Sequence, residues 1–263
     1  MGYVKNPKLE GTSIWDCRPQ AGLCKNWCNQ CFYNRPGAFY CDINEPNIPD
    51  PADVGNGIVR MNCGHDSNIQ KDLVLTIANR YKEVFFNTSI QNLDFPGPVV
   101  LTINPQEEEV WDLDKGLIAH RKLIPNLMFI RVRVSVTNMS KPAFFMDVFT
   151  KRWNVPVVLT PMAYYDHHPP GTYIRSDGHA YLTEEYASLL EADQPAYVWK
   201  VRHINSYWCP TPELLKAFVG SYITGNNKMI HLCGTADSGW CKDCGLCEHF
   251  YWITKKTMLM NTY

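Results

Sequence analysis

The chain has 263 residues, 45% of them hydrophobic and 13% aromatic, which is enough apolar material for a sizeable core and argues against disorder. Its net charge of −1 provides no overall field toward an anionic membrane, and it disfavours a long nucleic acid as partner. The sequence begins without an apolar leader and has no apolar run long enough for a membrane span, which predicts a cytoplasmic protein with no membrane partner.

The predicted elements alternate between strand and helix along the middle of the chain. Strands are expected over 57–63, 83–90, 98–104, 129–137, 155–162, 196–204 and 228–232, helices over 67–82, 140–153, 183–193 and 211–220, and a long irregular loop over 34–56. This alternation predicts an α/β fold with a parallel sheet, either a complete or partial β/α barrel or an open doubly wound sheet. We expect one domain over 1–205 and a small cysteine-rich module over 206–263.

The eleven cysteines gather near the two ends of the chain. Because disulfides are rare in a reducing compartment, metal ligation is the leading explanation for so many thiols. The stretch "GLCKNWCNQC" places Cys24, Cys28 and Cys31 at C-x3-C-x2-C spacing. Three thiolates so close together can bind one soft metal centre from a single loop. With Cys17 or Cys41 as a fourth ligand, the same residues would form a closed zinc or iron–sulfur site.

The triplet ahead of an α/β pattern resembles the radical S-adenosylmethionine (SAM) superfamily. The resemblance covers about residues 12–205 and implies a partial β/α barrel, with a [4Fe-4S] cluster held by Cys24, Cys28 and Cys31. The fourth iron would be left open to chelate SAM, so the protein would be an enzyme. The implied reaction is reductive cleavage of SAM to a 5′-deoxyadenosyl radical, which abstracts hydrogen from an unidentified small molecule, nucleotide or peptide. It also implies an external electron donor such as flavodoxin or ferredoxin.

The same resemblance implies that SAM contacts come from residues at the ends of the predicted strands. They are Gly64, Asp66, Asn87, Ser89, Ser135, Asn138, Thr160 and Met162. The chain departs from the superfamily at two points: Gln30 occupies the position where an aromatic residue is common, and His65 and Asp66 replace the usual Gly and Glu.

A second cysteine cluster lies near the C-terminus. Cys233, Cys241, Cys244 and Cys247 have C-x7-C-x2-C-x2-C spacing, and four thiolates satisfy one closed centre. The cluster resembles the auxiliary-cluster extensions of several radical SAM families, which implies a second [4Fe-4S] cluster. A structural zinc site is the alternative.

Three further residues are candidates for catalysis. Cys63 lies at the end of a predicted strand, where it is either a hydrogen donor or a small buried hydrophobe. Asp166 and His167 lie just past the strand at 155–162 and either contact substrate or belong to a polar loop. The alternative to the enzyme is a non-enzymatic zinc- or iron–sulfur-stabilised protein that binds a partner or transfers electrons.

Overall fold

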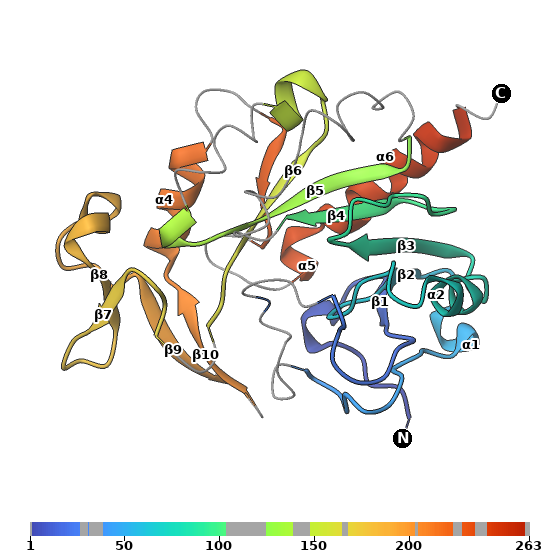
Figure 1. Cartoon of the computed structure of the whole chain (residues 1–263), viewed down its shortest axis with the longest axis horizontal. Coiled ribbons are helices and arrows are strands. Elements are labelled where there is room, and N and C mark those ends of the chain that lie inside the picture. The colour runs from blue at the N-terminus through green and yellow to red at the C-terminus, as the bar shows by residue number, and fades with distance from the viewer. Residues whose placement is uncertain are drawn as a thin grey trace.

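A seven-stranded parallel sheet forms the centre of the molecule (Figure 1). The computed structural model describes residues 2–26, 31, 39–103, 125–138, 148–164, 168–202, 205–222, 228–234 and 241–260. The strands are β1 (Ile14–Cys17), β2 (Ile58–Met61), β3 (Glu83–Thr88), β4 (Val99–Ile103), β5 (Leu127–Val134), β6 (Val157–Pro161) and β11 (Ile230–Leu232). They lie in the order β1-β2-β3-β4-β5-β6-β11, every neighbour being parallel. The predicted α/β class is therefore confirmed.

The strands form because they are short apolar runs that are buried on both faces of the sheet, as is usual for parallel strands. On β4, Val99, Val100 and Leu101 are all fully buried, although successive side chains point to opposite faces. Two separate apolar cores therefore flank the sheet.

One face, called here the α2 face, packs against helices that follow strands in the chain. These helices are α2 (Lys71–Ala78), the π-helical turn η6 (Val148–Arg152) and α4 (Pro212–Tyr222). Val74 of α2, Phe149 of η6 and Phe218 of α4 belong to the core on this face.

The opposite face, called here the α6 face, is covered by both ends of the chain. The covering elements are the 3-10 turn η1 (Pro7–Leu9), α5 (Cys241–Cys244) and α6 (Leu246–Met260). Phe250 and Tyr251 of α6 pack on Phe85 of β3 and Phe129 of β5. None of the helices in the described part of the chain has the length and apolar character needed to cross a bilayer.

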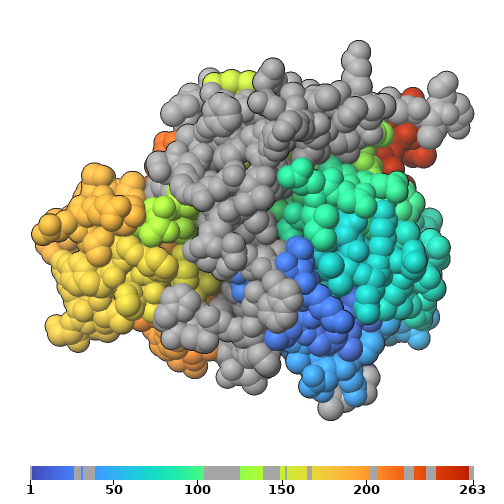
Figure 2. Space-filling model, in the orientation of Figure 1, coloured from blue at the N-terminus to red at the C-terminus, as the bar shows by residue number. Residues whose placement is uncertain are grey.

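A smaller antiparallel sheet lies beside the parallel one (Figure 1, left). Its strands are β7 (Thr172–Ile174), β8 (Ala180–Leu182), β9 (Tyr197–Arg202) and β10 (Asn205–Pro210), in the order β10-β9-β8-β7. Figure 2 shows this sheet, in yellow and orange, on the opposite side of the visible face from the blue and teal N-terminal strands. The remaining elements are α1 (Pro51–Val54) and the 3-10 turns η5 (Val136–Asn138) and η7 (Glu184–Leu189).

Several elements differ from the sequence-based expectations. The helix expected over 183–193 is the 3-10 turn η7, and the loop expected over 34–56 contains α1. The expected boundary between residues 205 and 206 falls within β10, which pairs with β9, and β11 from beyond it pairs with β6 in the main sheet. The C-terminal cysteines are thus integrated with the parallel sheet by β11 and α6.

Glu83 anchors α6 to the sheet, and its ionisation should contribute to stability. Its buried carboxylate accepts a hydrogen bond from Tyr251 at 2.6 Å and pairs with Lys255. Burial alone would raise the pKa of Glu83, but these two partners outweigh burial and lower it. Because the folded-state pKa is the lower one, this stabilisation is present at neutral pH and is lost as the pH falls below the ordinary glutamate value of about 4.3.

We therefore expect Glu83→Gln to lower the free energy of unfolding by about 1–3 kcal/mol at pH 7. The difference from wild type should shrink as the pH falls toward about 3, in urea titrations followed by circular dichroism. Glu184→Gln on the exposed turn η7 is the control. An equal loss at both pH values would contradict the role assigned to the charge.

Candidate functional site

Loops that follow β1, β2 and β3 meet at the carboxyl ends of these strands. After β2, His65 Nε2 lies 2.6 Å from the carbonyl oxygen of Gly22. Because a carbonyl oxygen can only accept a hydrogen bond, Nε2 is the ring nitrogen that carries the proton. Asn26 donates to Ser89 Oγ, after β3, at 2.7 Å. The segment that carries Cys24 is therefore held against the ends of two neighbouring strands, where parallel sheets usually place their sites.

Cys24 is the best-defined member of the triplet. Its residue is buried, and the backbone N–H groups of Asn26 and Asp66 lie near its sulfur, where they act to lower the pKa of the thiol. Burial raises the pKa of Cys24, and the nearby Cys31 and the Asp66 carboxylate contribute in the same direction. Cys28 lies outside the described residues. The donors present fit an iron–sulfur ligand, because such sulfurs commonly accept hydrogen bonds that tune the cluster.

Cys17 points away from this site. It is fully buried in the core of the α2 face and contacts the hydroxyl of Tyr81. A fourth ligand from Cys17 would require β1 to rotate. Cys41, by contrast, lies on a segment joined to the triplet loop by the bond from Gly22 N to Ile43 O, at 2.7 Å, and its sulfur accepts a bond from Arg18 at 3.6 Å.

Asp66 joins the ends of β2 and β3. Its carboxylate accepts four hydrogen bonds, from Ser89 N (2.6 Å), Ser89 Oγ (3.1 Å), Thr88 Oγ1 (2.8 Å) and Asn68 N (2.9 Å). Four donors fill the acceptor capacity of a carboxylate. Binding of the SAM ammonium by Asp66 would therefore require one of these donors to leave.

The two roles of Asp66 can be separated by Asp66→Asn. We expect this variant to lose about 1–3 kcal/mol of stability, because an amide cannot accept all four bonds. Thermal unfolding measures the structural role, and equilibrium dialysis with SAM measures the expected role in cofactor binding. Asp94→Asn, at a 96% exposed carboxylate, is the control. Weakened SAM binding with unchanged stability would show that the expected SAM contact is the main role.

The other expected SAM contacts lie at strand ends and are largely engaged within the protein. Asn87 donates to Met61 O (3.0 Å) and accepts from Arg131 (3.2 Å). Asn138 Oδ1 accepts from Ser135 N at 2.7 Å and caps the turn after β5. Gly64 has a φ of +95°, which glycine adopts readily.

The two expected SAM contacts at the end of β6, Thr160 and Met162, lie on different faces of the sheet. Met162 is buried in the core of the α2 face, and its N–H donates to Val134 O at 2.8 Å. Thr160 lies beside the thiol of Cys233. Asp166 and His167 lie outside the described residues.

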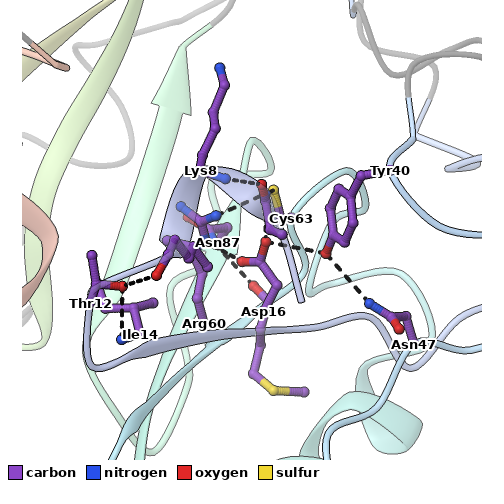
Figure 3. Close-up of polar contacts among 12 residues, drawn as sticks. Lys8, Thr12, Ile14, Asp16, Tyr40, Asn47, Arg60, Cys63 and Asn87 are labelled. Atoms are coloured by element: carbon purple, nitrogen blue, oxygen red, sulfur yellow. Dashed lines mark hydrogen bonds and ion pairs between the residues drawn. The ribbon is translucent and has the colours of Figure 1, made fainter. Parts of the chain in front are cut away.

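A buried ion pair on the α6 face connects the N-terminal segment with the end of β2 (Figure 3). The Asp16 side chain is 1% exposed, and it accepts from Arg60 Nε at 2.6 Å and from Asn6 at 2.7 Å. Arg60 also donates to Cys63 Sγ at 3.5 Å. The pKa of Arg60 is raised because Asp16, with smaller contributions from Cys63 and Cys241, outweighs burial.

The C-terminal cysteines gather on the same face. The thiol of Cys244 donates to Cys233, which lowers the pKa of Cys233 and raises that of Cys244. Cys241 and Cys247 pack at the edge of the core under α6. Burial raises the pKa of Cys247 to about 11, and Arg131 and Arg60 act in the opposite direction. Clustered thiols beside cations fit a centre of soft metal and anionic ligands.

In the residues that the structure describes, no group of three histidine, cysteine or acidic side chains is arranged to hold a metal ion as it stands. The argument for metal therefore depends on the chemistry and proximity of the donors. Sequence reasoning found the cysteines by their spacing but missed Arg60 and Arg131. The available signal was arginine inside an apolar strand, one in "GIVRMNC" and two in "FIRVRVSVT".

Comparison of the chain with protein-family models, with curated proteins and with solved structures finds no match.

Proposed function

We propose that this protein is a radical SAM enzyme whose catalytic cluster is held by Cys24, Cys28 and Cys31. The observation that carries the proposal is the position of Cys24: it lies in the loop after the first strand of an all-parallel sheet, buried against the loop after the second. All ten cysteines in the described part of the chain are free thiols, the form that can bind a metal.

The topology favours a partial barrel and disfavours a doubly wound sheet. In doubly wound folds the strand order reverses at a switch point, whereas these seven strands follow chain order from β1 to β11 without reversal. Barrel folds add each strand beside the previous one in this way. The helices α2 and α4 cover one face, so the α6 face corresponds to the interior of such a barrel.

The residues have distinct roles in the proposed site. Three thiolates would hold the cluster, and the backbone N–H groups of Asn26 and Asp66 would stabilise the charge on Cys24. A bound, reduced cluster supplies the electron that splits SAM to methionine and a 5′-deoxyadenosyl radical. Asn87 and Ser89, at the end of β3, would orient SAM, and Cys63, Asp166 and His167 are the candidates for contact with the substrate.

We further propose a second thiolate centre at Cys233, Cys241, Cys244 and Cys247, and an external donor such as flavodoxin or ferredoxin for the electron. A cytoplasmic location suits these free thiols. Purely structural zinc at both clusters is the main rival, and it loses support because Cys17 faces away from the triplet. Cys41 remains the alternative fourth ligand.

The test is anaerobic purification and reconstitution, followed by iron, sulfide and zinc analysis. The protein is then reduced with dithionite in the presence of SAM, and 5′-deoxyadenosine is measured by chromatography. Iron with 5′-deoxyadenosine formation supports the enzyme. Zinc alone with intact SAM overturns it, and iron with intact SAM favours an electron carrier.

A further inference from the structure

Arg131 of β5 points to the α6 face, toward the carboxyl end of the sheet. It pairs in register with Thr102 of β4 and Val158 of β6. Its guanidinium donates to Asn87 Oδ1 at 3.2 Å and to Thr102 Oγ1 at 3.4 Å. Both acceptors are neutral, so neither cancels its charge.

Two of the C-terminal thiols, those of Cys233 and Cys247, lie near this guanidinium. Cys247 packs on the core that contains Phe129, which precedes Arg131 by two residues on the same face of β5. His231 of β11 aligns with Val158, the register partner of Arg131, and Cys233 follows it by two residues. Both thiols have Arg131 as an electrostatic neighbour.

Lys8 and Arg60 are the other cations beside these thiols, and Arg60 differs from Arg131 in one respect. Arg60 is neutralised by the buried Asp16 at 2.6 Å. Within the described ranges, the ion pairs do not include Arg131. The positive charge of Arg131 is thus the less compensated of the two.

We propose that Arg131 is the charge-compensating residue of an iron–sulfur centre held by Cys233, Cys241, Cys244 and Cys247, and that it raises the reduction potential of this centre. The inference rests on the second centre of the proposed function. Reduction adds a negative charge to a centre that already carries several thiolates, and a nearby cation favours that step. Arg131 acts here through its charge and takes no part as a ligand.

The experiment uses the full chain with Cys24, Cys28 and Cys31 replaced by alanine, so that only the C-terminal centre can bind iron. The reconstituted protein is titrated potentiometrically and followed by electron paramagnetic resonance. We expect Arg131→Gln to lower the ratio of reduced to oxidised centre at a fixed potential by about tenfold, or about 59 mV for one electron. Arg131→Lys should retain most of the wild-type potential. Arg175→Gln, on an exposed arginine of the antiparallel sheet, is the control.

A second variant leaves the arginine in place. Asn87→Asp puts a carboxylate against the guanidinium with little change in shape, and it should also lower the potential. Full iron content with wild-type potential in both Arg131→Gln and Asn87→Asp overturns the inference and leaves the centre standing. Zinc in place of iron overturns the inference together with the redox centre. SAM cleavage by the wild-type chain, measured separately, tests the catalytic triplet.

Discussion

Cys24→Ala is expected to lower SAM cleavage by at least about 100-fold, a loss greater than that usual for residues that only support metal ligands. The sulfur of Cys24 is buried between backbone N–H donors of its own loop and of the loop after β2. Cys17 cannot take its place without a rotation of β1, because Cys17 lies in the core of the α2 face. The proposed C-terminal centre should keep its metal.

The measurement is 5′-deoxyadenosine formation together with iron content per chain. Cys17→Ala is the matched control, since it removes a buried thiol of the same half of the chain from the α2-face core. It should retain activity. Cys41→Ala separates an open site from a closed one: an open three-thiolate site keeps its iron, whereas a closed site loses it. Full activity in Cys24→Ala would exclude Cys24 as a ligand.

Much of the parallel sheet could be predicted because its strands are apolar runs with clear ends. The strand β1 was missed, and its composition explains why. It has only four residues, one of them Asp16, and a charged residue argues against a buried strand until its partner is known. That partner, Arg60, is 44 residues away in the chain. Local patterns cannot show such a pairing.

The helix α6 was missed for a related reason. Its residues are aromatic, charged and cysteine-rich without clear helical periodicity, so the segment was assigned to a metal module. In the structure, the helix is held by long-range packing of Phe250 and Tyr251 on the sheet and by the anchor at Glu83. Tertiary contacts decide such helices more than propensity does.

In the candidate site too, the sequence indicated where residues lie but not which groups they bond. The sequence correctly placed Asn87, Ser135 and Asn138 near strand ends, because the predicted strand boundaries were close. It could not show that hydrogen bonds with Met61 O, the Arg131 guanidinium and Arg133 O already occupy the side-chain amides of Asn87 and Asn138. A side chain expected to bind SAM can therefore do so only if it first gives up a hydrogen bond to another part of the protein.

We expect Arg18 to be as important for metal binding by the triplet as one of its cysteines, although Arg18 itself binds no metal. This residue is 2% exposed, and its guanidinium donates to four carbonyls, those of Gln20 (3.3 Å), Ile43 (2.9 Å), Asp42 (2.6 Å) and Glu45 (2.8 Å). It thereby ties the start of the cysteine loop to the segment that hydrogen-bonds Gly22. The hydrogen bonds to Gln20 O and Ile43 O are buried, and those to Asp42 O and Glu45 O are partly buried.

We expect Arg18→Ala to lower the free energy of unfolding by at least about 3 kcal/mol, because each unsatisfied buried carbonyl is costly. Iron bound by the triplet should fall with it, while the C-terminal centre, which depends on other contacts, is affected less. Arg18→Lys keeps the charge but has only three donors, so it should recover part of both losses. Arg175→Ala on the surface should change stability by less than about 1 kcal/mol.

The informative result is the ratio of the two iron contents, measured on the variant under conditions in which circular dichroism shows it to be folded. A folded Arg18→Ala chain that loads the triplet normally would mean that the loop is organised by the cysteines and their metal. Selective loss at the triplet would mean that the polypeptide shapes the loop before metal arrives. The second outcome is expected, because Arg18, Gln20 and His65 already fix the loop through hydrogen bonds that involve no metal.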